Sequence, residues 1–442
     1  MDAKPGQSFD RVDTSGMVAR INPREEWQNV YTDTWRIFRD FFYEPGMHGV
    51  DWRAVYDQYF AMLKDAVNRH DVTHISKEMI SELNIGHAYY SGGDLESASP
   101  VRVGHLGAEY EFVEDGSDQA YRITRILKGG PWDTDARGPL SEPGIKVEEG
   151  EYLLAINGEL LTRIYTPYAA LEAQGGRLVE LTINDEPEMN DDARTVVVRA
   201  LRNDNNLRYR AWVERNRQYV KEQSGGRVGY IYVPNTGVDG QNELIRQFTS
   251  QKHKDALIID ERWNGGGQIP TRFVEVLDRP ISSFFALRHG NPWVVPDYAH
   301  HGPKAMLING RSGSGGDMFP FLFRQAGLGP LIGQRTWGGL VGISYNPHVV
   351  DLAFLAVPRF AFYELDGTWG IEGFGVAPDI PVTADPALLA GDTGRTEVLR
   401  DPQLDRAIKE MLDELDRNPP VKVVPPPKGP NRSGMGIDPR DR

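Results

Sequence analysis

The sequence predicts a multidomain α+β protein with a helical N-terminal subdomain, a small β domain and a C-terminal α/β sandwich domain. Three successive sequence patterns along the chain support this prediction. Apolar residues recur at helical spacing up to about residue 83, short β-type runs broken by Gly and Pro follow, and strands then alternate with helices. A chain of 442 residues is also too long for one core. The predicted boundaries are a flexible segment 1–22, a helical subdomain 23–103, a β domain 104–200, an α/β domain 201–417 and a flexible Pro-rich tail 418–442.

The composition excludes several classes of function. A formal charge of −14 argues against a nucleic-acid partner, because phosphate binding needs a basic surface. The absence of cysteine excludes disulfides, a thiol nucleophile and zinc–thiolate sites. The polar N-terminus lacks the apolar core of a signal peptide, and no apolar stretch approaches the ~20 residues that span a bilayer. We therefore expect a cytoplasmic protein with no membrane contact.

The helical subdomain is predicted from three runs of large apolar residues at three- and four-residue spacing. They cover 27–38, 52–67 and 74–83. Helical spacing of this kind indicates burial, so these aromatic residues are interpreted as core.

The β domain contains three strand-like runs, 121–126, 152–156 and 194–199. The second leads into Asn157-Gly158, a pair typical of a tight hairpin turn. The stretch from Gly144 to Gly158 resembles a PDZ domain, and any small β domain with an Asn-Gly hairpin is the alternative.

The C-terminal region is predicted to be α/β. Residues 207–223 have the pattern of a helix, and buried strands are expected at 228–233, 256–260 and 305–309. Helical stretches follow these strands, as in a sheet with helices packed on it.

Two glycine-rich loops follow strands of this region. After the strand at 305–309, the loop Arg311-Ser-Gly-Ser314-Gly-Gly-Asp317 leads into a helix that we expect to begin near Asp317. It would expose the Ser314 hydroxyl at a helix N-terminus, where free N–H groups favour negative charge. A plain turn and a phosphate loop are the alternatives, although a Walker-type loop would end in Lys and Ser or Thr. The second loop, Asn264–Gly267, follows the strand at 256–260, and such strand ends form ligand crevices.

A serine nucleophile needs a proton acceptor, usually His or a desolvated Lys. No lysine lies between Ser314 and Lys409, which excludes a Ser-Lys pair with a lysine some twenty-five residues downstream. Ten histidines remain. His87 lies between a predicted helix and a Gly-rich turn, where a lone histidine is more often structural.

Taken together, these segments resemble the catalytic core of tricorn protease, in the tail-specific (carboxyl-terminal processing) serine peptidase clan. The resemblance runs from about Ile21 to Met411, and its most specific segments are Asp260–Gly267, Gly310–Phe319, Leu331–Ile343 and Gly375–Asp379. It implies a serine peptidase that acts on peptides or unfolded protein segments, without a metal or other cofactor, and that forms a homo-oligomer, a trimer or hexamer. The family's full architecture has β-propellers ahead of this region, so we expect either a shorter relative or part of a longer protein.

The resemblance also assigns roles to residues. It implies Ser314 as the nucleophile, His87 as the general base and Glu372 as the acid on the histidine side. The backbone N–H groups of Gly267 and Gly315 would form the oxyanion hole.

Two positions depart from the family. Gly86 replaces a serine that precedes the catalytic histidine, so a hydroxyl-mediated link to the acid would be lost. Phe285 falls where the family has an acidic residue that selects basic side chains, so a preference for apolar or aromatic side chains is expected. A catalytically impaired PDZ-bearing scaffold that binds peptides and an esterase on the same site are the alternative functions.

Overall fold

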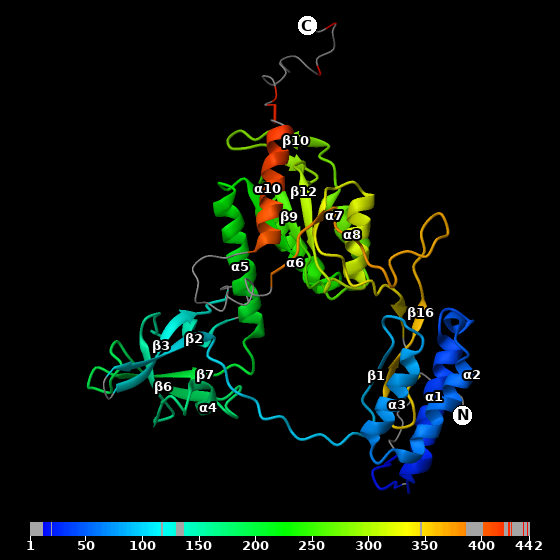
Figure 1. Ribbon diagram of the computed structural model, residues 1–442. Coiled ribbons are helices and arrows are strands. Elements are labelled where there is room, and N and C mark those ends of the chain that lie inside the picture. The colour runs from blue at the N-terminus through cyan, green and yellow to red at the C-terminus, as the bar shows by residue number, and fades with distance from the viewer. Residues whose placement is uncertain are drawn as a thin grey trace. The chain divides into compact units, whose positions relative to one another are not determined.

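The structure, a computed structural model, describes residues 12–385 and 401–419 apart from 19, 116–117, 130–136 and 345–346, together with 423, 424, 426, 436 and 440. The chain divides into two compact units (Figure 1). The first combines Met1–Ser97 with Leu340–Glu372, and the second combines Ala98–Gly339 with Gly373–Arg442. Each unit is described by itself. Most of the two segments expected to be flexible, 1–22 and 418–442, lies outside the described residues.

The first unit is built on three helices that match the predicted apolar runs. Each helix begins where a side chain or a Pro satisfies its N-terminus: Asn22 caps the first, Asp51 the second and Asn68 the third. These helices are α1 (Pro23–Phe41), α2 (Trp52–Phe60) and α3 (Arg69–Ser81), with 3-10 turns at η1 (Met47–Gly49) and η2 (Ala61–Asp65).

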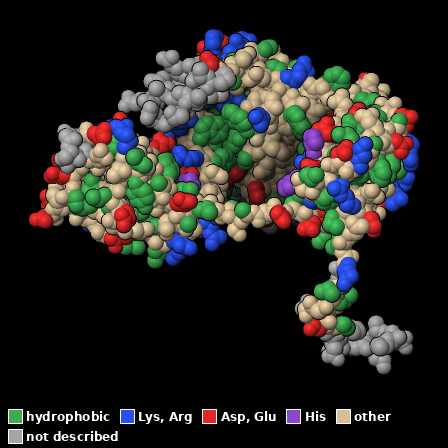
Figure 2. All heavy atoms as spheres, turned by 60° about the horizontal axis from the view of Figure 1, so that its bottom comes forward, with side chains coloured by type: hydrophobic (Ala, Val, Ile, Leu, Met, Phe, Trp, Pro, Cys, Tyr) green, Lys and Arg blue, Asp and Glu red, His purple; other side chains and the backbone are tan. Residues whose placement is uncertain are grey.

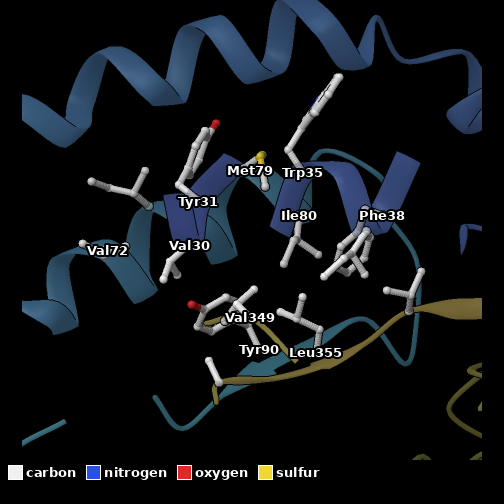
Figure 3. Packing of buried hydrophobic residues seen from close by; sticks show 14 of the residues in the cluster. Val30, Tyr31, Trp35, Phe38, Val72, Met79, Ile80, Tyr90, Val349 and Leu355 are labelled. Carbon is white, nitrogen blue, oxygen red and sulfur yellow. The ribbon is translucent and has the colours of Figure 1, made fainter. Parts of the chain in front are cut away.

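The core of the first unit lies between these helices and a short antiparallel ladder (Figure 3). Val30, Tyr31 and Phe38 of α1 have no exposed surface. Other aromatic residues interpreted as core are partly buried and pack against this cluster: Trp27, Tyr56, Tyr59 and Phe60. Tyr90 and Leu355 close the other side of this core from two paired strands (Figure 3). The strands of this unit are β1 (Tyr89–Ser91) with β15 (Phe354–Ala356), and β14 (Gly342–Ile343) with β16 (Pro358–Phe360).

The β domain of the second unit is an antiparallel sheet in the order β2-β3-β4-β6-β7, with β5 paired to β4. Its alternating apolar residues form one core. Asn157 and Gly158 both have positive φ and join β4 to β5 as a two-residue hairpin, which confirms the predicted tight turn. The elements are β2 (Ala108–Asp115), β3 (Asp118–Ile126), η3 (Pro139–Ser141), β4 (Tyr152–Ile156), β5 (Glu159–Leu160), α4 (Pro167–Ala170), β6 (Leu178–Asn184) and β7 (Arg194–Arg199).

The α/β domain contains a five-stranded parallel sheet in the order β17-β13-β12-β9-β8. Every residue of the strands β8, β9, β12 and β13 is buried, as expected for a parallel sheet covered on both faces. The strands are β8 (Val228–Tyr232), β9 (Ala256–Asp260), β12 (Lys304–Ile308), β13 (Leu331–Gly333) and β17 (Ile380–Pro381). The predicted α/β sandwich is confirmed, with the third predicted strand one residue earlier than expected.

Helices cover both faces of this sheet (Figure 1). One face packs against α5 (Asn205–Gln223) and α10 (Pro402–Arg417) through a shared apolar cluster. The remaining helices are α6 (Val238–Gln251), α7 (Pro270–Leu277) and α8 (Gly315–Gln325), and a separate hairpin joins β10 (Ser283–Phe285) to β11 (Trp293–Val295).

The surface carries acidic and basic side chains interspersed over the face drawn in Figure 2. Among the described residues, none of the helices has the length and apolarity needed to cross a membrane.

Candidate active site

Four loops at the carboxyl end of the parallel sheet surround Ser314. They follow β8, β9, β12 and β13, and ligands of open α/β sheets bind at this edge. Ser314 ends the loop after β12 and directly precedes α8, which begins at Gly315 rather than near Asp317 as expected. The serine is half-buried, between fully buried neighbours on both sides.

The backbone of Ser314 is strained. Its φ of 59° and ψ of −118° lie in a region that non-glycine residues rarely occupy. Such a conformation costs on the order of 1–3 kcal/mol and persists only where surrounding contacts impose it. One such contact is the N–H of Ser314, which donates to the Asp317 carboxylate at 2.8 Å.

The carboxylate of Asp317 also accepts hydrogen bonds from other backbone N–H groups. The residue is fully buried, and its carboxylate accepts the N–H groups of Gly338 at 2.8 Å and Gly339 at 3.1 Å as well as that of Ser314. Burial raises the pKa of Asp317, while these backbone donors and Thr336 act in the opposite direction. The carboxylate thus ties the nucleophile loop to the loop that follows β13.

The glycine loop after β9 packs directly on the serine loop. The N–H of Gly313 donates to the Asn264 carbonyl at 3.0 Å, and a Cβ on Gly266 would lie 2.6 Å from Cβ of Ser314. A Cβ on Gly315 would overlap Thr236 and lie 2.8 Å from the amide nitrogen of Gly267. Only glycine permits this approach of two backbones.

The amides of Gly267 and Gly315 are available to a ligand. Within the described part of the chain, neither N–H donates a hydrogen bond to a protein acceptor. Both residues lie beside the nucleophile, so the loops can present two convergent N–H donors to a negatively charged oxygen.

A buried ionic network supports the glycine loop. The Arg262 guanidinium, which has no exposed surface, pairs with Asp260 at 2.7 Å and with Asp401 at 2.8 Å. Asp401 caps α10 by accepting two backbone N–H groups. The positive charge of Arg262 is therefore paired with one carboxylate at the end of β9 and with a second at the start of α10, 139 residues further along the chain.

Glu261, next to this network, has no exposed surface, and burial raises its pKa well above the usual range. The neighbouring charges of Asp317 and Asp260 act in the same direction, which favours the neutral acid at this position.

The other predicted site residues, His87 and Glu372, lie in the first unit. Glu372 accepts the N–H of Gly86 at 3.1 Å through Oε1, and those of Leu340 and Val341 at 2.6 and 2.8 Å through Oε2. The four successive N–H groups from 338 to 341 therefore donate to two carboxylates, the first two to Asp317 and the next two to Glu372.

His87 lies beside this carboxylate and is half-buried. Burial lowers the pKa of His87 below its ordinary value of 6.5, and the negative charge of Glu372 opposes that shift. The lowered pKa favours the neutral imidazole, the form that accepts a proton. The φ of His87 is 57°, and Ile371, which precedes Glu372, has a φ of 63°.

Gly86 changes how the histidine segment is held. A hydroxyl-mediated link is absent at this position, but the backbone N–H of Gly86 itself donates to Glu372. The acid is thus joined to the residue that precedes His87 without a side chain at position 86.

Phe285 ends strand β10 and pairs with Trp293 across the β10–β11 hairpin. Both rings are largely exposed, each with 63% of its surface accessible. The sequence analysis singled out Phe285 but missed the aromatic partner on the second strand.

No metal centre is formed by the described residues, among which there is no cluster of three or more His, Asp or Glu side chains arranged to hold an ion. Sequence reasoning also missed the roles of Asp317, Glu261 and Arg262. The pattern Ser314-x-x-Asp317 ahead of an apolar helix has the spacing of a capping box, which could have identified the first of them.

Three segments of the chain match known protein families. Residues 23–81 match the tricorn protease C1 domain, residues 104–203 the tricorn protease PDZ domain, and residues 227–382 peptidase family S41. The matches follow one another in the order in which the structure presents helices, β domain and α/β domain.

Whole proteins with similar sequence are tricorn proteases. The chain is 36% identical over 92% of its length to tricorn protease homolog 1 of Streptomyces coelicolor, and 30% identical over 90% to the tricorn protease of Thermoplasma volcanium. A crystal structure of the tricorn protease covers 92% of the chain with a TM-score of 0.83 and 30% identity. The chain spans 37% of the length of each of the two relatives and 38% of that crystallised chain.

The α/β domain and its Ser314 loop thus belong to a serine peptidase of family S41. The helical and PDZ domains beside it are of the tricorn type, and the chain as a whole resembles the corresponding part of tricorn protease.

Proposed function

We propose that the chain hydrolyses peptide bonds through Ser314, His87 and Glu372 by way of an acyl-enzyme. The observation that carries this proposal is the geometry around Ser314. Its backbone has the strained φ of 59° and ψ of −118°, and the amides of Gly267 and Gly315 lie beside it. A strained residue held by surrounding contacts next to backbone N–H donors is typical of a functional site.

The proposed reaction uses the side chains in fixed roles. Ser314 Oγ attacks the carbonyl carbon of the peptide while His87 takes the hydroxyl proton, and the carbonyl oxygen becomes an oxyanion. The N–H groups of Gly267 and Gly315 hold that oxygen, each worth about 2.7–4 kcal/mol to the transition state. His87 then gives the proton to the leaving amine, and water releases the acyl group with the same histidine as base.

Glu372 is proposed to orient His87 and to stabilise its protonated form. Three backbone N–H groups hold the Glu372 carboxylate in place, so its negative charge stays in one position within the first unit. An acid in this role need not exchange protons with the histidine.

The substrates we propose are peptides or unfolded protein segments, in line with the family of the α/β domain. Phe285 is proposed to contact the substrate, and an exposed ring favours apolar or aromatic side chains over basic ones. The cytoplasm is the proposed location, and the cysteine-free composition is compatible with a reducing compartment.

Ser314→Ala tests the proposal. We expect the wild-type chain to react with a fluorophosphonate probe and to cleave a panel of fluorogenic peptides, fastest after apolar or aromatic residues. The variant should lose both reactions while it keeps the wild-type circular dichroism spectrum. Unchanged peptide turnover by Ser314→Ala would refute the nucleophile, and fastest cleavage after Arg would refute the role of Phe285.

The same assays separate the alternatives. An esterase would react with the probe and turn over nitrophenyl esters but not peptides. A catalytically impaired scaffold would bind peptides without reacting with the probe.

A further inference from the structure

We propose that Asp317 is a positioning residue for the nucleophile, an inference that rests on the function proposed above. Asp317 is not placed to touch a substrate, because its side chain has no exposed surface. It acts instead on the backbone that carries Ser314.

The contacts of Asp317 join two loops of the site. One oxygen, Oδ2, accepts the N–H groups of both Ser314 and Gly339, and the other accepts that of Gly338. Ser314 belongs to the loop after β12, whereas the two glycines belong to the loop after β13. A single carboxylate therefore joins both loops, and its three N–H donors favour the ionised form of Asp317.

These hydrogen bonds maintain the strained conformation of the serine. A φ of 59° is unfavourable for a residue with a Cβ, so the backbone would relax unless it were held. Relaxation at Ser314 would turn the peptide that carries the N–H of Gly315, one of the two proposed oxyanion donors. The same carboxylate thus controls the direction of both the nucleophile and a donor.

Asp317→Asn is the direct test in the full chain. The amide side chain has nearly the same shape, but its NH2 group cannot accept the N–H that faces it. We expect kcat for a peptide substrate to fall about 100-fold while KM stays within about twofold, because misplacement of a reacting group affects the chemical step. The rate of fluorophosphonate labelling should fall by a similar factor.

Asp71→Asn provides a matched control. Asp71 occupies the same third position of helix α3, and its carboxylate accepts the N–H groups of Val67 and Asn68. This variant removes an equivalent helix cap with no nucleophile beside it. We expect a lower melting temperature in both variants and a fall in kcat only in Asp317→Asn.

The outcomes are separable. A folded Asp317→Asn with kcat within twofold of wild type, a loss that appears only in KM, or an equal loss of kcat in Asp71→Asn would overturn the positioning role. If Asp317→Asn does not fold, Thr336→Val decides, since Thr336 also hydrogen-bonds Asp317. It should lower kcat at constant KM, and an unchanged kcat would overturn the inference. A wild-type chain that fails to react with the probe would instead refute the proposed function.

Discussion

His87 and Glu372 show how two opposing effects set the protonation of a candidate base. Burial favours the neutral imidazole, and the nearby carboxylate favours the imidazolium. The balance lies on the neutral side, because the pKa of His87 remains below 6.5. A base with this pKa is ready to accept a proton at pH 7 and gives it up readily afterwards.

Glu372→Gln should shift the acid limb of the pH profile. Removal of the negative charge destabilises the imidazolium, so the pKa of His87 falls further and the limb of kcat/KM moves to lower pH. We expect kcat itself to decrease, because the protonated histidine formed during the reaction loses its stabilising partner. The measurement is kcat/KM for a peptide from pH 4 to pH 9.

Glu364→Gln is the control for this experiment, because it removes the same charge from the same segment of the chain. The carboxylate whose charge acts on the pKa of His87 is that of Glu372. Its profile should superimpose on that of the wild type. A limb that moves to higher pH in Glu372→Gln would contradict the assigned sign.

At the scale of elements, the glycine loop and helix α8 form one backbone-to-backbone contact. Gly315→Ala would place a Cβ against Thr236 and 2.8 Å from the amide nitrogen of Gly267. We expect kcat to fall by about 10²–10³, since displacement of that amide removes an oxyanion donor. Steady-state kinetics with circular dichroism as a check on folding would measure the effect.

Gly310→Ala is the matched variant in the same loop. A Cβ there would lie 3.6 Å from the Arg335 carbonyl oxygen, an ordinary contact, and activity should stay close to wild type. Equal losses in both variants would show that the loop tolerates no alanine at all, and the specific role of Gly315 would be wrong.

The sequence predicted the elements well and their contacts poorly. Periodicity located α1, α2 and α3, and the Asn157-Gly158 pair located a hairpin, because both signals are local. The Asp260–Arg262–Asp401 network could not be predicted in this way, since its members are separated by up to 141 residues and spacing along the chain carries no information on such pairs.

For the candidate site too, local features could be predicted from the sequence and contacts between distant residues could not. Glycine-rich strand ends indicated a crevice from local sequence, whereas His87 and Glu372 were assigned through a family resemblance. The hydrogen bond from Gly86 to Glu372 was not predicted, because a backbone donor leaves no mark on the residue type.

At the scale of the whole molecule, we propose that the chain forms a trimer or hexamer. Two exposed aromatic residues of the β10–β11 hairpin, Phe284 and Trp293, provide apolar surface for contact with a neighbouring copy. Light scattering at micromolar concentration should give three or six times the mass of one chain. A monomer under these conditions would contradict the assembly, and Trp293→Ser should weaken it if the hairpin takes part.

The pairing of Arg262 with Asp401 determines when, during synthesis of the chain, the loops around Ser314 can reach their final structure. Until the ribosome has added Asp401 and helix α10 has emerged from the exit tunnel, Arg262 lacks one of its two carboxylates. Arg262 would then be paired with Asp260 alone. Loss of one partner from a buried ionic network destabilises a fold by up to about 3–5 kcal/mol, so the glycine loop beside Arg262 should be less stable before Asp401 is in place. The serine loop is translated long before that point. The nascent chain should thus carry its nucleophile before the loop that supplies the proposed oxyanion donor Gly267 is fully stabilised.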